Sequence, residues 1–263
     1  MDPALRASAS GMIAQQTRIE VIANNLANVN TPGFKRGRVT FEDLLYETLQ
    51  GTGIVNYENA ETVAPVQVGR GVRLASIQRI HTQGAPQPTQ RPLDIAIEGI
   101  GFFQVQRPDG TTAYSRDGSF SLSDTGTLVT HGGYTVIPGI TVPPESRGLS
   151  ISPTGIMSVV LGSDGEAVEL GRIELARFVN PAGLLSIGEN LFTATAASGP
   201  ALRGFPQEGG FGRVLQGMLE TSNVEIVLEM VEMISAQRAY EVNSRAIRTA
   251  DEMTESAING LLR

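Results

Sequence analysis

The C-terminal end of the chain carries a regular hydrophobic pattern. From Met233 onward, apolar or small residues recur at steps of three and four, the heptad spacing that keeps one stripe of a helix against a partner helix. Ser222 and Glu225 are spaced as a capping box, so we predict a helix from Asn223 to Leu262, about 60 Å long. The stripe consists of Met233, Ala236, Tyr240, Asn243, Ile247, Ala250, Thr254, Ala257 and Leu261.

A second helical stripe lies at the N-terminal end, where Asp2 and Pro3 suit the N-cap and the first helical position. Gly11 and its neighbouring serines weaken this helix by roughly 1 kcal/mol, so it needs a partner. An ordinary amphipathic core helix is the alternative, but the matching stripe at the other end favours two paired helices. Asn243 would then fix their register. The N-terminal stripe consists of Leu5, Ala9, Met12, Gln16, Ile19, Ala23 and Leu26.

The first turns of the predicted C-terminal helix are apolar almost all round. One short partner helix cannot cover that much surface, so we expect neighbouring subunits to bury it. The residues are Ile226, Val227, Leu228, Met230, Val231, Met233 and Ile234.

Short strands and tight turns replace the helical pattern between Val72 and about Val214. The turns are marked by Asp-Gly and Gly-Gly pairs, and their regular spacing predicts an antiparallel β domain. The expected strands include Asp94–Glu98, Phe102–Gln106, Gly126–Thr130, Tyr134–Ile137 and Met157–Leu161.

These patterns predict an α+β fold with N- and C-terminal helices paired as a coiled-coil-like domain and a central antiparallel all-β domain. The expected boundaries are 1–34 with 222–263 for the helical assembly domain, 35–71 for an extended linker or hairpin, and 72–221 for the β domain.

The composition and charge of the chain exclude several classes of function. The chain of 263 residues has no cysteine, which excludes disulfides and thiolate chemistry, and its net charge of −7 argues against nucleic-acid binding. No apolar run is long enough for a membrane span, and Met1 to Ala14 do not form a Sec signal peptide. We therefore expect no membrane insertion and either a cytoplasmic location or export without a cleaved signal.

The chain shows no recognisable catalytic set, so we expect neither an enzyme nor a cofactor or metal. Gly99-Ile-Gly101 lacks the third glycine of a dinucleotide loop, and the Asp-Gly pairs are not spaced as a calcium loop. His81 and His131 are the only histidines, have no neighbouring ligand motif, and are expected at surface or strand positions.

The N-terminal helix ends in an asparagine-rich segment followed by cations. Asn24, Asn25, Asn28 and Asn30 exceed what a helix stop requires, so we expect some of these amides to bridge to another helix or subunit. Pro32-Gly33 predicts a type II turn. Lys35, Arg36 and Arg38 predict a surface that forms salt bridges with an acidic neighbour.

This segment, ANNLANVNTPGFKR, resembles the signature of the bacterial flagellar rod and hook proteins. The following VTFEDLLY is most similar to the distal rod members. The family's outer β domain is matched by GIGFF, YSRDGSF and GENLF, and its C-terminal motif by LETSNV, EMVEMI and QRAYEVN, so the whole chain is covered.

The resemblance implies a structural subunit of the distal rod of the flagellar basal body. Such a subunit polymerises into a helical tube with its terminal helices inside, transmits torque to the hook, encloses the export channel, and leaves the cell by type III export. The implied partners are further copies, the proximal rod, the hook, the surrounding ring proteins and the export apparatus. Alternatives are another rod or hook-family protein, a periplasmic cell-wall hydrolase or a surface binding module.

The residues expected to make assembly contacts come from both helices and from the segment that follows the first. They are Leu5, Met12, Ile19, Asn24, Asn25, Leu26, Asn28, Phe34, Lys35, Ile226, Met230, Met233, Ile234, Arg238, Tyr240, Asn243, Ile247 and Leu261.

Overall fold

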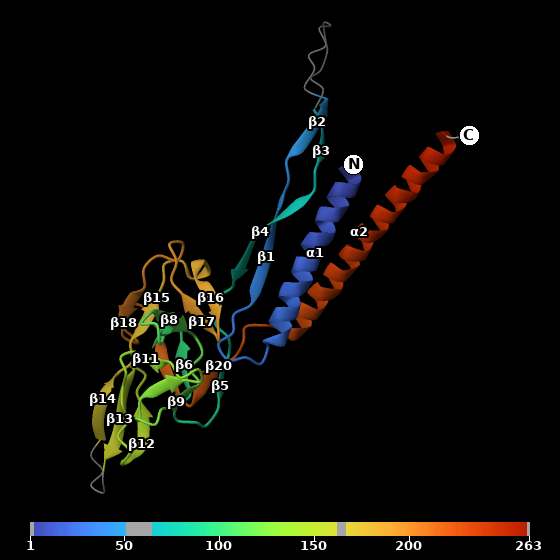
Figure 1. Ribbon diagram of the computed structural model, residues 1–263. Coiled ribbons are helices and arrows are strands. Elements are labelled where there is room, and N and C mark those ends of the chain that lie inside the picture. The colour runs from blue at the N-terminus through green and yellow to red at the C-terminus, as the bar shows by residue number, and fades with distance from the viewer. Residues whose placement is uncertain (1–2, 51–64, 162–166, 262–263) are drawn as a thin grey trace. The chain divides into compact units, whose positions relative to one another are not determined.

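The computed structural model describes residues 3–50, 65–161 and 167–261 (Figure 1). The chain divides into two compact units. Unit 1 comprises Met1–Leu26, Gly37–Gln78 and Glu225–Arg263, and unit 2 comprises Ala27–Arg36 and Arg79–Val224. The predicted α+β class, with a helix near each end and antiparallel strands between them, is confirmed.

Unit 1 contains both long helices, α1 (Pro3–Ala27) and α2 (Ile226–Leu261). The predicted cap Asp2 lies outside the described residues. The expected start of the second helix at Asn223 is wrong, because α2 begins at Ile226 and the carbonyl of Glu225 accepts the bond from the Glu229 N–H at 3.0 Å. The Ser222 hydroxyl instead accepts a bond from the Val224 N–H at 3.3 Å, which forms a local turn before the helix.

The described part of unit 1 also contains two strand pairs. β1 (Gly37–Asp43) pairs with β4 (Val72–Arg79), and β2 (Tyr46–Gln50) pairs antiparallel with β3 (Val66–Gly69). The β1–β4 pair reaches α1, since the Ser10 hydroxyl accepts a bond from the Val72 N–H at 3.2 Å. The segment 35–71, predicted as an extended linker or hairpin, contains β1, β2 and β3, and its residues 51–64 lie outside the described part of the chain.

In its described residues, unit 2 is built from antiparallel sheets and one short 3-10 helix (Pro181–Gly183). The largest sheet has nine strands. Its path runs β16 (Leu185–Gly188), β17 (Leu191–Thr193), β8 (Thr112–Ser115), β7 (Phe102–Gln106), β11 (Thr135–Val136), β10 (Leu128–Thr130) and β9 (Phe120–Leu122), with β15 (Leu175–Arg177) paired to β7 and to β18 (Leu202–Gly204). The other sheets are β12 (Ser146–Ile151), β13 (Ile156–Leu161) and β14 (Ala167–Arg172), then β6 (Ile95–Glu98) with β19 (Arg213–Gln216), and β5 (Pro86–Pro88) with β20 (Met218–Glu220).

The core of unit 2 lies where the predicted strands are buried. β6 and β7 bury nearly every residue, which accounts for the dense apolar runs on both sides of Gly99-Ile-Gly101. Asp109-Gly110 and Gly132-Gly133 turn the chain between paired strands as predicted, whereas Asp164-Gly165 lies outside the described residues. Within the described ranges, no helix is long and apolar enough to cross a membrane.

Candidate assembly surfaces and a buried charge cluster

The first turns of α2 present an apolar surface that unit 1 leaves uncovered. Val227 is 72% exposed and Val231 is 59% exposed, and Ile226, Leu228, Met230 and Ile234 are also exposed. Only Glu229 and, further on, Ala236 are fully buried in this stretch. Contiguous apolar side chains on one helix are typical of an interaction surface, because burial would stabilise each by about 1.5–3 kcal/mol. We call Ile226–Ile234 the α2 apolar surface.

Polar contacts join α1 and α2 inside unit 1. The Asn25 amide donates to the Glu229 carboxylate at 3.1 Å, and Arg18 pairs with Glu232 at 3.5 Å. Farther along, a Cβ at Gly11 would lie 2.9 Å from the Asn243 amide nitrogen, so glycine permits close approach there. From one contact to the next, the residue number falls in α1 while it rises in α2. The helices are therefore antiparallel where they meet.

Asn25 also ties α1 to β1. Its side-chain oxygen accepts a bond from the Gly37 N–H at 2.8 Å, and its amide donates to the Gly37 carbonyl at 2.9 Å. Because Asn25 is only 1% exposed, these bonds satisfy an otherwise costly buried amide. The bridging role expected for this group of asparagines is therefore found at Asn25.

The other residues predicted to make assembly contacts fall into three groups, and their role in assembly stays a prediction. Buried side chains are Phe34 and Lys35. Half-buried side chains are Leu5, Met12, Ile19, Leu26, Asn28, Met233, Asn243 and Ile247. Exposed side chains are Asn24, Ile226, Met230, Ile234, Arg238 and Tyr240, while the side chain of Leu261 is outside the described set.

Lys35 does not belong to a cationic surface with Arg38, because it lies inside unit 2. Its ammonium group pairs with the Glu220 carboxylate and donates to the Thr82 carbonyl at 2.7 Å. The same carboxylate accepts a bond from Arg116 Nε at 2.8 Å and another from the Gly84 N–H at 2.9 Å. The Lys35 and Glu220 side chains are each 1% exposed, so burial lowers the lysine pKa while Glu220 opposes that shift.

The turn before Lys35 fits tightly against this cluster. Gly33 has φ +68° and the Phe34 N–H donates to the Thr31 carbonyl at 3.2 Å, which confirms the predicted type II turn. A Cβ on Gly33 would lie 2.6 Å from the Asp117 backbone nitrogen, and its own N–H donates to the Glu220 carbonyl at 2.8 Å. Glycine is therefore required by both conformation and space.

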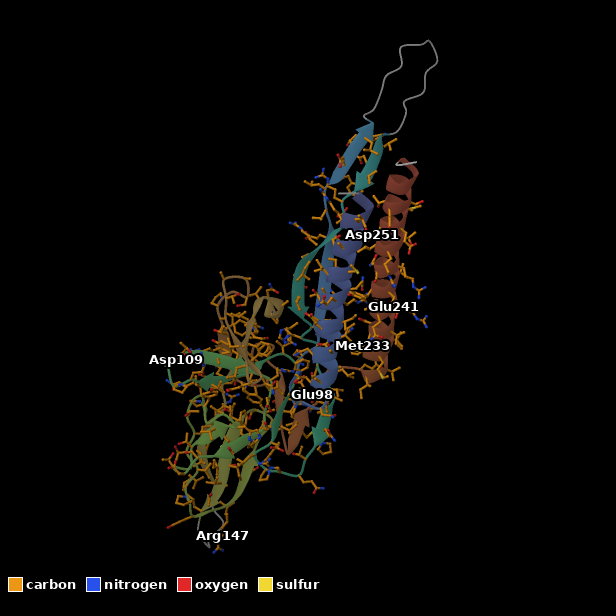
Figure 2. All side chains as sticks on the ribbon, turned by 45° about the vertical axis from the view of Figure 1, so that its right-hand side comes forward. Glu98, Asp109, Arg147, Met233, Glu241 and Asp251 are labelled. Atoms are coloured by element: carbon orange, nitrogen blue, oxygen red, sulfur yellow. The ribbon has the colours of Figure 1, made fainter. Side chains whose placement is uncertain are left out.

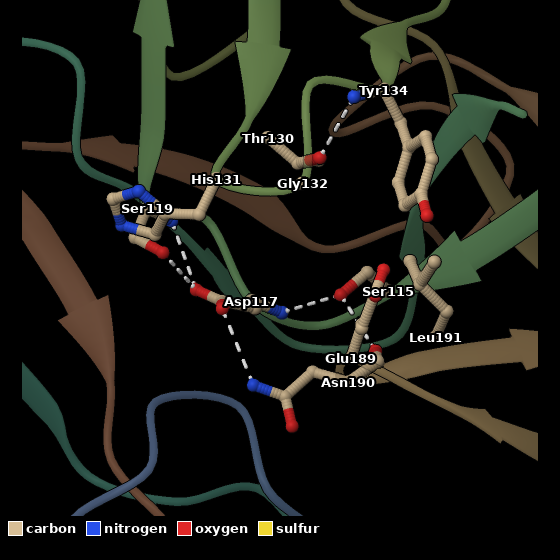
Figure 3. Close-up of a pocket in the computed structure, with 10 residues that line it drawn as sticks. All are labelled: Ser115, Asp117, Ser119, Thr130, His131, Gly132, Tyr134, Glu189, Asn190 and Leu191. Atoms are coloured by element: carbon tan, nitrogen blue, oxygen red, sulfur yellow. Dashed lines mark hydrogen bonds between the residues drawn. The ribbon is translucent and has the colours of Figure 1, made fainter.

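A hollow of about 410 Å³, lined mostly by residues with polar side chains, lies beside Asp117 and the turn joining β16 to β17 (Figure 3). One Asp117 oxygen accepts bonds from the Ser119 N–H at 3.0 Å and hydroxyl at 2.6 Å, and the other accepts from Asn190 at 3.3 Å. The Tyr134 hydroxyl pairs with Glu189, which raises the tyrosine pKa. The Asp117 carboxylate thus orients two loops, and among the described residues no cluster of histidine or carboxylate side chains could hold a metal.

The expected surface or strand position is wrong for His81, which lies between β4 and β5 with its ring in an aromatic cluster of unit 2. Its ring packs edge-on against Phe102 and Phe192 at centroid distances of 5.6 and 5.4 Å. Both ring nitrogens are buried without a hydrogen-bond partner. Burial, together with the nearby cations Lys35, Arg116 and Arg79, lowers the His81 pKa to about 4. The neutral imidazole is therefore the form that the fold accommodates.

This shift predicts a pH-dependent stability. Because the pKa in the folded state lies below its usual 6.5, the His81 contribution is complete above pH 6.5 and is lost as pH falls toward 4. The expected loss is about 3 kcal/mol in the free energy of unfolding. Urea unfolding of the wild type and of His81→Phe across this range measures it. The variant should show a shallower decline, and parallel curves would contradict the assignment.

The exposed α2 apolar surface is typical of a protein that packs against another molecule. Family models match three parts of the chain: the Flagella basal body rod protein at residues 5–35, the Flagellar hook protein FlgE/F/G D1 domain at 96–159, and the Flagellar basal body rod FlgEFG protein C-terminal at 215–260.

Curated relatives extend this similarity over the full chain. The flagellar basal-body rod protein FlgG of Borreliella burgdorferi is 51% identical, with 97% of each chain covered. FlgG of Caulobacter vibrioides is 49% identical over 96% of this chain and 97% of the relative, whereas FlgF of the same organism is 32% identical over 99% and 98%. The chain belongs to the flagellar basal-body rod protein family. It is a structural rod component of the flagellum.

Proposed function

We propose that this chain is a subunit of the distal rod, which polymerises with further copies into a helical tube. The observation that carries the proposal is the α2 apolar surface, whose valines at 227 and 231 are more than half exposed in the single chain. A repeated contact between unlike surfaces produces a filament when it does not close into a ring. Higher identity to FlgG than to FlgF of Caulobacter favours this position over the alternative rod protein.

In the proposed tube, α1 and α2 form a coiled-coil-like inner layer. The contacts of Asn25 with Glu229 and of Arg18 with Glu232 support this pairing, and Gly11 allows the helices to approach at Asn243. The α2 apolar surface then packs against neighbouring copies. The assembly transmits torque toward the hook and encloses the export channel, with the proximal rod, hook, ring proteins and export apparatus as partners.

Electron microscopy of the purified, concentrated protein tests this function. We expect straight tubes or stacked rings above a threshold concentration, because the uncovered surface favours association. A monodisperse protein at every concentration, with activity on cell-wall glycans, would contradict the proposal and favour the hydrolase alternative. Sedimentation of the same samples gives the threshold concentration.

A further inference from the structure

A second hollow in unit 2, of about 400 Å³, has the character of a contact site. Phe102 and Phe178 form its apolar wall, and both are buried. Two strongly exposed apolar side chains stand among its lining residues: Val179 is 82% exposed and Ile100 is 60% exposed. Large apolar side chains exposed around a concave surface are typical of a place where another molecule is received.

The charges behind this hollow do not cancel. Lys35 and Arg116 both line it, and both pair with the single carboxylate of Glu220. Arg79 adds a third cation, with its guanidinium donating to the Lys35 carbonyl at 2.9 Å. Among the described residues, two acceptors lie within hydrogen-bonding distance of the Lys35 ammonium group, which has three donor hydrogens. The hollow therefore has exposed apolar side chains at its opening and buried, positively charged side chains at its bottom.

His81 adds an unused hydrogen-bonding group at the same place. It lines the hollow, and neither ring nitrogen has a partner. A neutral imidazole offers one N–H donor and one acceptor. Burial is the main cause of its lowered pKa, and the three nearby cations lower the pKa further while Glu220 raises it. A group that brought negative charge here would relieve both the charge imbalance and the unmet donor.

We propose that this hollow binds a carboxylate-bearing side chain from a second copy of the chain, with Val179 and Ile100 packing against the aliphatic part of that side chain. Charge complementarity supports a second copy, because the chain as a whole carries a net charge of −7. Unit 2 also exposes acidic side chains at Asp124, Glu145 and Glu169. The inference rests on the proposed polymer and adds a contact outside the terminal helices.

Substitutions of opposite charge at the entrance distinguish a carboxylate from an apolar occupant. Val179→Asp should raise the threshold for polymerisation at least tenfold, because it repels the incoming carboxylate. Val179→Lys should raise the threshold at least threefold less than Val179→Asp, because it loses the same apolar packing but attracts the incoming carboxylate. Val168→Asp is the matched control, since Val168 is exposed in unit 2 but does not line the hollow. Sedimentation of purified full-length protein measures each threshold, and thermal unfolding verifies that the monomers are folded.

Three results would overturn the proposal. Equal thresholds for Val179→Asp and Val168→Asp would show that the hollow does not lie in the contact between copies. Equal impairment by aspartate and lysine at position 179 would indicate an apolar occupant. Propionate that binds the monomer saturably without inhibiting polymerisation would indicate a free acid instead of a second copy.

If the wild-type chain forms no tubes, the proposed function is wrong, and a second copy cannot be the source of the carboxylate in the hollow. Titration of that monomer with propionate, followed through the His81 NMR signals, still tests the hollow itself. A saturable shift supports a carboxylate site, and its absence overturns it.

Discussion

Replacing Glu220 by glutamine is expected to lower the free energy of unfolding of unit 2 by about 3–5 kcal/mol. The amide keeps the size of the side chain but removes the negative charge between Lys35 and Arg116. Both cations are buried, with side-chain exposures of 1% and 6%, so each would lose its counter-charge away from water. Chemical denaturation followed by circular dichroism measures the loss.

The matched control for this experiment is Glu98→Gln. Glu98 also pairs with an arginine, Arg213 at 2.5 Å, but those side chains are 41% and 53% exposed. An exposed ion pair contributes at most about 1 kcal/mol, so this variant should stay close to wild type. Similar losses in the two variants would mean that the buried cluster does not depend on the Glu220 charge.

Replacing Val231 by aspartate is expected to raise the polymerisation threshold at least tenfold without destabilising the monomer. Val231 is 59% exposed, so the free chain loses little packing. In the polymer, the new carboxylate would be buried in an apolar contact without a partner, which costs free energy of desolvation. A tenfold change in the threshold corresponds to ~1.4 kcal/mol, and even a part of the desolvation cost exceeds that value. Sedimentation and electron microscopy report the threshold and the form of the product.

Gln237→Asp serves as the control for charge on the same helix. Gln237 is exposed and lies outside the α2 apolar surface. Its variant should assemble near the wild-type threshold. If both variants assembled equally well, the α2 apolar surface would not be the principal contact, and the proposed packing of α2 against neighbouring copies would fail.

Periodic patterns predicted the elements of this fold because they record local geometry. The strand predicted at Phe102–Gln106 coincides with β7. The heptad stripe that begins at Met233 lies within α2, along which Figure 2 labels Met233, Glu241 and Asp251. The start of α2 was missed because the predicted capping box of Ser222 and Glu225 does not form. The Ser222 hydroxyl accepts a bond from the Val224 N–H, while the Asn223 amide donates to the Ile80 carbonyl and its oxygen accepts from the Arg36 N–H. Side chains that bond a local turn or a distant segment hold this stretch outside the helix.

The buried cluster could not be predicted from spacing. Lys35 and Glu220 are 185 residues apart, and Arg116 and Glu220 are 104 residues apart. Lys35 stands beside Arg36 and close to Arg38 in the sequence, so a surface patch was the simpler interpretation. Only the tertiary structure brings its partner to it. The family motifs contain all three residues but do not reveal that they meet.

The Lys35–Glu220–Arg116 cluster also constrains the order in which the chain can fold. Two of its members precede β20 by long stretches of sequence, so their shared counter-ion is the last to be synthesised. Until residue 220 is available, a collapsed unit 2 would bury two cations with nothing to neutralise them, and contacts this distant in sequence also form slowly. We therefore expect unit 2 to stay open during synthesis and to close only after Glu220 has been added to the chain.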